Sequence, residues 1–206
     1  VQLGPTYYYA SSEPDALRLY QRVAEASDVS IMVYNTWWEG LNMSLDLLRR
    51  IAEIETVRAL KWDTPDHDTY RDGIVIFAND LVVIDNKDEH ILSHMLGARG
   101  FIAHLGGCWP EYSLKIWQLL EQRDYAAASE TLASLKWGWR RWTRKVAEVT
   151  AGEGPIIKAP MEEVGLRVGP PRPPAIRPPE HLLAELRDLM RSAGVPGLRV
   201  AQEGVQ

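Results

Sequence analysis

SIMVYN at residues 30–35 and VRALK at residues 57–61 each contain a short apolar run that ends in a polar side chain, Tyr34 or Lys61. Both runs have the length of buried strands, and residues 44–54 between them have the apolar spacing of a helix. A strand, a helix and a second strand predict a parallel βαβ unit. Tyr34 and Lys61 then lie at the carboxyl ends of neighbouring strands, where α/β folds hold their active sites.

A lysine at the end of a buried strand suggests reactive chemistry. Burying an unpaired ammonium is costly, so desolvation lowers the pKa of such a lysine. A neutral amine can attack a carbonyl carbon and form a Schiff base. Neighbouring strands lie about 4.8 Å apart, so the phenol of Tyr34 could reach the same ligand as Lys61. A structural interpretation stays open, in which Lys61 points into solvent and Tyr34 packs in the core.

Strands and helices alternate through the first half of the chain, and the second half reads as helices. The expected strands are residues 1–3, 30–34, 57–61, 81–84 and 100–104, and the expected helices between them are 12–26, 44–54, 66–77 and 88–96. Further helices are expected at residues 111–122, 125–135, 137–149, 156–164 and 180–192. Repeated βα units build TIM barrels and doubly wound sheets. Neither GxGxxG nor GxxxxGK[ST] occurs, so nothing supports a nucleotide-binding fold.

The amino-acid composition limits the expected binding partners and the expected cellular location of the protein. The 206 residues carry a net charge of −5, so nucleic acid is not an expected partner. The densest basic stretch, residues 136–145, interleaves tryptophans with arginines, and its spacing is typical of a packed helix with arginines reaching to solvent. The sequence contains no stretch of about 20 apolar residues, so a membrane is not an expected partner. It has a single cysteine, which excludes a disulfide framework. We therefore expect a cytoplasmic protein.

The order of four motifs resembles one enzyme family. GPTYY at residues 4–8, Tyr34 with Asn35, Lys61, and LGARGFI at residues 96–102 resemble the dihydrodipicolinate synthase and N-acetylneuraminate lyase family of class I, lysine-dependent aldolases. The resemblance implies a TIM barrel with extra C-terminal helices. It also implies that the chain starts at the fourth strand, so the expected fold is α/β, a partial TIM (β/α)8 barrel of strands four to eight. That barrel part would occupy residues 1–109, and a C-terminal helical region with a proline-rich strap at 169–179 would occupy residues 110–206.

The resemblance also implies a reaction and its residues. Lys61 would form the Schiff base with the keto carbon of pyruvate or a related 2-oxo acid, and Tyr34 would move the proton. Tyr8 matches a tyrosine that reaches into a neighbouring subunit's site, which implies a homo-oligomer. The backbone of Ile102 matches a position facing the bound 2-oxo acid. The expected activity is that of a lyase without a cofactor, acting on a small 2-oxo acid and an aldehyde.

Three further side chains are expected to contribute to the substrate pocket. Asn35 follows Tyr34 directly, Trp38 lies in the loop beyond it, and His104 ends the last expected strand. A half-buried histidine with its own partners is an equal interpretation for His104.

Two departures from the family pattern affect the expected function. Residues 36–39 read TWWE where the synthases carry a carboxylate-binding arginine, which favours an apolar or aromatic acceptor and a hydratase-aldolase. The first three strands and the threonine-rich carboxylate loop of the family have no counterpart, so we expect an N-terminally truncated chain. The alternative is a non-catalytic metabolite-binding or oligomerisation fragment of the same fold.

Three other patterns could indicate a metal site, a nucleophile and a peptide ligand, but a structural interpretation is preferred for each. His90 and His94 have a spacing that can bind zinc, but a polar helix face is the preferred interpretation, and no metal site is expected. Cys108 lacks the partners of a catalytic nucleophile. PPRPP at residues 170–174 resembles an SH3 ligand, but an extended strap leading into the last helix is preferred.

Overall fold

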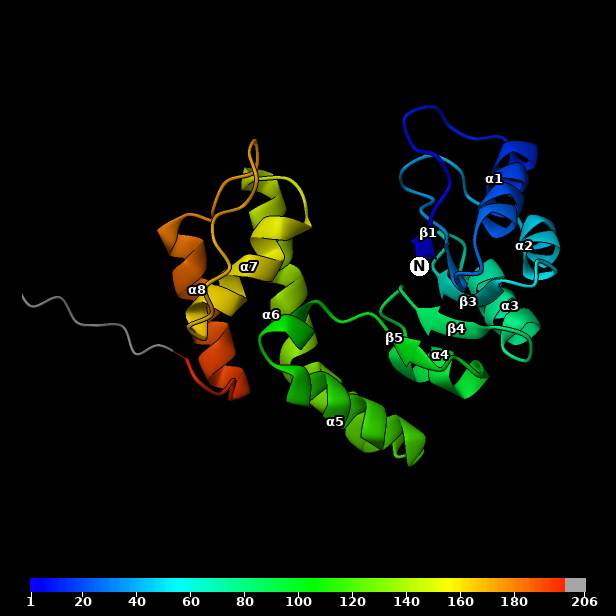
Figure 1. Cartoon of the computed structure of the whole chain (residues 1–206). Helices are drawn as coiled ribbons and strands as arrows, with labels where there is room; N and C mark the ends of the chain where they lie inside the picture. The colour runs from blue at the N-terminus through cyan, green and yellow to red at the C-terminus, as the bar shows by residue number, and fades with distance from the viewer. Residues whose placement is uncertain (199–206) are drawn as a thin grey trace, which may run out of the picture. The chain divides into compact units, whose positions relative to one another are not determined.

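A computed structural model describes residues 1–198 of the chain, which divides into two compact units between Ile102 and Ala103. The first unit is an α/β unit built on five parallel strands (Figure 1). The strands are β1 (Gln2–Leu3), β2 (Ile31–Tyr34), β3 (Val57–Trp62), β4 (Val82–Asp85) and β5 (Gly100–Phe101). They pair in sequence order, β1-β2-β3-β4-β5, so every crossover steps to the next position in the same direction.

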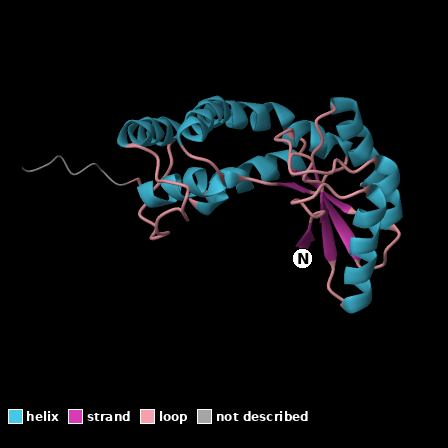
Figure 2. Cartoon of the chain, turned by 90° about the horizontal axis from the view of Figure 1, so that it is seen from above, coloured by secondary structure: helices cyan, strands magenta, loops and turns pink. Residues whose placement is uncertain are grey.

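Four helices connect these strands and cover one face of the sheet. They are α1 (Glu13–Ala26), α2 (Leu45–Ala52), α3 (His67–Phe77) and α4 (His90–Leu96). Right-handed crossovers that all step in one direction place their helices on the same face of the sheet. Figure 2 shows the strands fanned out, with these helices along one side of them. Val83 on the covered face is fully buried, whereas its neighbour Val82 on the opposite face is 46% exposed. The opposite face of the sheet therefore has little cover within this unit.

The sequence begins and ends these helices with local signals. The side chain of Ser12 caps α1 in a reciprocal box with Asp15. Ser44 caps α2, and Asp66 caps α3. Gly97 ends α4 in the left-handed region at φ 113°. The expected positions of these four helices are therefore confirmed to within a few residues.

The last strand is shorter than expected, and the prediction that it reaches residue 104 is wrong. β5 ends at Phe101, which pairs with Asp85, the last residue of β4. Ile102 still donates its N–H to the carbonyl of Asp85 at 2.9 Å, but the following residues have no strand beside them. His104 instead begins a short 3₁₀ helix, η1 (His104–Gly107).

The second unit is helical and has a hydrophobic core of its own. Its helices are α5 (Pro110–Glu121), α6 (Tyr125–Val149), α7 (Glu153–Glu163) and α8 (Glu180–Ala193). The core gathers Trp142 and Val146 of α6 with Leu183 and Leu186 of α8. No helix within residues 1–198 is long and apolar enough to span a bilayer. Residues 199–206, the end of the expected helical region, lie outside the described residues.

The prediction of two helices at residues 125–135 and 137–149 is wrong, because α6 runs through both. Gly138, which lies just after the expected break, marks a close approach between helices instead. A Cβ atom at Gly138 would lie 2.4 Å from Cδ1 of Leu189 in α8. The missing side chain thus lets α8 pack against α6 without ending the helix.

Candidate active site

Tyr34 and Lys61 lie side by side at the carboxyl edge of the sheet. They are register partners in β2 and β3, so their side chains leave the same face. Val33 and Leu60, one residue earlier in each strand, point into the core under the helices, so Tyr34 and Lys61 point away from it. Nζ of Lys61 lies 3.7 Å from the centroid of the Tyr34 ring, and Lys61 is 9% exposed. The two expected catalytic side chains are therefore in contact on the less covered face.

Asn35 is fully buried, and its polar atoms bind other parts of the protein. Its Nδ2 donates to Oδ1 of Asn42 at 2.9 Å and to the carbonyl of Asp63 at 2.8 Å. Its Oδ1 accepts the backbone N–H of Met43 at 3.0 Å. Asn35 thus joins the loop after β2 to the end of β3, and its expected contact with substrate stays a prediction.

Two indoles extend from Tyr34 along the loop after β2. The ring of Trp38 lies edge-on to that of Tyr34 at 5.7 Å and to that of Trp37 at 5.6 Å. Trp38 is 47% exposed, whereas Nε1 of Trp37 is buried without a hydrogen-bond partner. Buried donors are normally satisfied, so this N–H is an unusual feature beside the candidate site.

The remaining predicted site residues, Tyr8, Ile102 and His104, belong to three different segments of the chain. Tyr8 is 81% exposed in the loop after β1, with its ring edge-on to Tyr9 at 4.9 Å. Ile102 follows β5 and is held to β4 by its N–H, at the same edge of the sheet as Lys61. His104 belongs to the second unit, where its Nε2 lies 3.6 Å from Oε1 of Glu153.

A buried polar network lies behind the sheet at the end of β4. Asp85 is fully buried, and it accepts hydrogen bonds from the hydroxyl of Tyr70 at 2.6 Å and the backbone N–H of Lys87 at 2.7 Å. Nδ1 of His90 lies 2.6 Å from its second oxygen. Burial alone would raise the pKa of Asp85, but these bonds outweigh it and leave that pKa below its ordinary value. Burial also raises the pKa of Tyr70, which keeps its phenol a donor.

His90, one of the two histidines with a zinc-binding spacing, is part of this hydrogen-bonded network. The ring of His90 is stacked on that of Phe101 at 4.1 Å, besides its contact with Asp85. Among residues 1–198, no group of three or more His, Cys, Asp or Glu side chains is arranged to hold a metal ion.

A second lysine, Lys87, lies near the end of β3. Its Nζ is 3.2 Å from Oδ1 of Asp63, with both side chains about one-seventh exposed, and it also donates to the carbonyl of Thr64. Sequence reasoning missed this pair, since 24 residues separate its members and no motif joins them. Lys87 lies two residues after Asp85, the last residue of β4, and this position near a strand end is the signal that could have pointed to it.

Cys108 and the proline-rich strap are held by internal contacts. Burial raises the pKa of the Cys108 thiol to about 11, and its Sγ donates to the carbonyl of Leu105. Nζ of Lys158 donates to the carbonyls of Val168, Gly169 and Pro170, which fixes the start of the strap against α7.

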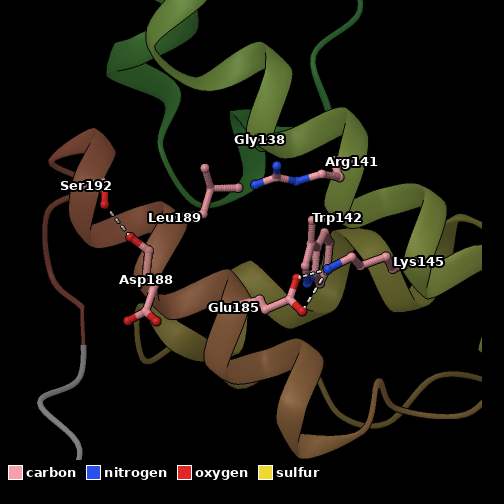
Figure 3. Close-up of a pocket in the computed structure, with 8 residues that line it drawn as sticks. All are labelled: Gly138, Arg141, Trp142, Lys145, Glu185, Asp188, Leu189 and Ser192. Atoms are coloured by element: carbon pink, nitrogen blue, oxygen red, sulfur yellow. Dashed lines mark hydrogen bonds and ion pairs between the residues drawn. The ribbon is translucent and has the colours of Figure 1, made fainter.

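A separate groove of about 420 Å³ lies between α6 and α8 in the second unit (Figure 3). Nζ of Lys145 pairs there with both oxygens of Glu185 at 2.6 and 2.8 Å. The indole N–H of Trp142 donates to the carbonyl of Leu182.

Arg141, Asp188 and Ser192 also line the groove. The polar groups of α8 there are engaged with the protein itself, since the Asp188 carboxylate accepts from Arg191 and the Ser192 hydroxyl donates to the carbonyl of Asp188. We take the edge that carries Lys61 and Tyr34 as the candidate active site, because two side chains of complementary chemistry are in contact there.

Comparison with known proteins gives concordant matches. Residues 2–193 match the sequence profile of the Dihydrodipicolinate synthetase family. The chain is 29% identical over 195 residues to 4-hydroxy-tetrahydrodipicolinate synthase of Exiguobacterium sibiricum, covering 93% of this chain and 64% of that protein. It is 28% identical over 200 residues to an uncharacterized DapA-like lyase of Thermococcus onnurineus, covering 93% of this chain and 66% of that lyase. The chain thus spans less than two thirds of the length of the first of these relatives.

Solved structures show the same fold. Dihydrodipicolinate synthase from Thermotoga maritima superposes with a TM-score of 0.81 at 21% identity, over 94% of this chain and 66% of that one. The chloride-inhibited dihydrodipicolinate synthase from Acinetobacter baumannii, complexed with pyruvate, gives a TM-score of 0.80 at 21% identity, over 94% and 65% of the two chains.

Proposed function

Since the chain belongs to the dihydrodipicolinate synthetase family, we propose that it is a lyase whose Lys61 forms a Schiff base with pyruvate or a related 2-oxo acid. The observation that carries this proposal is the contact of Nζ of Lys61 with the Tyr34 ring, 3.7 Å from its centroid, at the carboxyl edge of the sheet. The side chain is also largely shielded from water, so its amine and a carbonyl carbon would meet away from bulk solvent.

The two side chains have complementary tasks in this chemistry. The amine of Lys61 adds to the keto carbon, and loss of water gives an imine. The protonated imine accepts the electron pair released when a bond at the neighbouring carbon breaks, and the resulting enamine returns that pair when the bond reforms. Tyr34 gives and takes the proton during these steps, since its phenol lies beside Lys61.

We further propose that the loop after β2 selects an aromatic or uncharged aldehyde, as a hydratase-aldolase would. Trp38 is in contact with Tyr34 and is half exposed, so an acceptor approaching Tyr34 meets an indole. Aromatic pairs contribute roughly 0.5–1.5 kcal/mol beyond the burial of their area.

The architecture supports two proposals about assembly. The one-sided sheet, with β1 and β5 at its edges, fits strands four to eight of a TIM barrel, and further strands would complete the barrel over the exposed Val82. Tyr8 is exposed, and in a homo-oligomer it would reach a neighbouring subunit's site. Sizing chromatography tests the oligomer, and a monomer at micromolar concentration would contradict it.

Borohydride trapping tests the central proposal. The protein is reduced in the presence of pyruvate, and peptide mass analysis locates the adduct, which we expect on Lys61. Lys61→Met should abolish the adduct, and Lys145→Met, which alters a lysine of the second unit, should leave it unchanged. Tyr34→Phe should still form the imine but slow proton exchange at the methyl group of pyruvate by roughly 10²–10⁴-fold. An adduct on another lysine, or none, would favour the non-catalytic alternative.

A further inference from the structure

Asp63, two residues beyond Lys61, joins the ends of three consecutive strands. Its carbonyl accepts from Nδ2 of Asn35 at the end of β2. Its carboxylate accepts from Nζ of Lys87 in the loop after β4, at 3.2 Å. The same Nζ donates to the carbonyl of Thr64. The backbone that leaves Lys61 is therefore held from both neighbouring strands.

The other end of Lys87 is also anchored. Its backbone N–H donates to Oδ1 of Asp85 at 2.7 Å, and Asp85 is fixed by Tyr70 and His90 in the buried network. The Nζ of Lys87 lies 5.6 Å from the centroid of the Tyr70 ring. Hydrogen bonds thus hold both the backbone and the ammonium end of Lys87, so this lysine links the end of β4 to the segment after β3.

The Asp63–Lys87 pair differs from the arginine ion pairs of the first unit. Those pairs, such as Arg18 with Asp15 and Arg71 with Asp68, join residues three apart in sequence, and at least half of each side chain is exposed. Exposed pairs of that kind contribute little. Asp63 and Lys87 are only 13% and 14% exposed and connect two strands, so their pairing constrains the sheet edge itself.

We propose that Lys87, through Asp63, is a positioning residue that holds Lys61 against the Tyr34 ring. The catalytic meaning of this proposal rests on the proposed function of Lys61.

The test compares Lys87→Met, Lys87→Arg and Asp63→Asn with the wild-type protein, and uses Lys145→Met as the matched control that breaks an ion pair in the second unit. The rate of borohydride trapping is measured against pyruvate concentration. Displacing a reacting group by about 1 Å can cost roughly 10²-fold in rate. We expect Lys87→Met to lower the maximal trapping rate by about 10–10²-fold with little change in the half-saturating pyruvate concentration. Lys87→Arg should recover most of the rate, because its guanidinium can still bind Asp63.

A second measurement does not depend on pyruvate. Acetic anhydride labels each lysine, and peptide masses give the rate at each position. We expect Lys61 to be labelled several-fold faster in Lys87→Met than in the wild type, and Lys87 to be labelled faster in Asp63→Asn. Lys145→Met should change neither rate.

The outcomes separate this proposal from the proposed function. A wild-type protein that traps no pyruvate refutes the function, and the labelling rates still decide the positioning. Unchanged labelling of Lys61 in Lys87→Met overturns the positioning, as does an equal change in Lys145→Met. Trapping that is normal in every variant overturns it while leaving the function intact.

Discussion

Adding one methyl group at Gly73 should destabilise the first unit, although alanine is the better helix former. Gly73 lies inside α3, and a Cβ atom there would be 2.7 Å from Cε2, Cζ2 and Nε1 of Trp62. The indole has no room to retreat, since Trp62 is fully buried and its Nε1 donates to the carbonyl of Tyr70 at 2.9 Å. The clash should move Trp62 or α3, and Trp62 directly follows Lys61.

The magnitude is a difference of two effects. Overpacking a well-filled core typically costs about 1–3 kcal/mol, and the rigid indole places Gly73→Ala near the upper end. Replacing glycine by alanine inside a helix returns about 1 kcal/mol. The net loss should be about 2 kcal/mol, which for a unit of about 100 residues lowers the melting temperature by roughly 8–16 °C.

Calorimetry of Gly73→Ala measures this loss, with Gly40→Ala as the control in the same unit. A Cβ atom at Gly40 would meet only ordinary contacts, at 3.6 Å or more, so its substitution should change the unfolding free energy by no more than about 0.5 kcal/mol. The cost of Gly73→Ala should shrink in a Trp62→Phe background, because phenylalanine has a single, smaller ring in place of the fused indole that the new Cβ would meet. A Gly73→Ala protein that melts above the wild type would refute the reasoning.

Three further predictions concern other sites. Asp85→Asn should lower the unfolding free energy by about 1–3 kcal/mol at pH 7. Because the folded protein holds the pKa of Asp85 below its ordinary value of about 3.9, this deficit should be complete above that pH and shrink as pH falls below it, which urea titrations at neutral and acidic pH would show. Cys108, with a pKa of about 11, should react with a disulfide reagent far more slowly in the native protein than in urea, and fast native labelling would contradict its burial. Trp38→Arg should shift the ratio of kcat/KM values towards a carboxylate-bearing aldehyde, and a wild type that already prefers that aldehyde would end the proposed selectivity.

Local patterns predicted most of the first unit. The apolar runs that end at Tyr34 and Lys61 place both residues in adjacent strands, and the structure pairs them directly. The capping residues Ser12 and Ser44 mark helix starts by the same hydrogen bonds that make them frequent at such positions. These signals act over a few residues, so a sequence displays them without knowledge of the fold.

The predictions fail where contacts between residues far apart in sequence determine the structure. The expected break between residues 135 and 137 does not occur, because α6 packs continuously against α8, with Leu189 filling the space beside Gly138. The last strand stops at Phe101 because its partner strand stops at Asp85, which no local pattern records. The pairing of Asp63 with Lys87 likewise depends on two strand ends meeting at one edge of the sheet.

The sequential order of the strands also bears on how the chain is made. From β2 onward, each strand pairs with the one synthesised just before it, and the paired residues Tyr34 and Lys61 lie 27 positions apart. At a synthesis rate of about 5–20 residues per second, a strand emerges from the ribosome within seconds of its partner. Contacts between near segments also close short loops, which favours rapid folding. The sheet can therefore grow by one strand at a time during translation, with Lys61 brought beside Tyr34 before the second unit has been made.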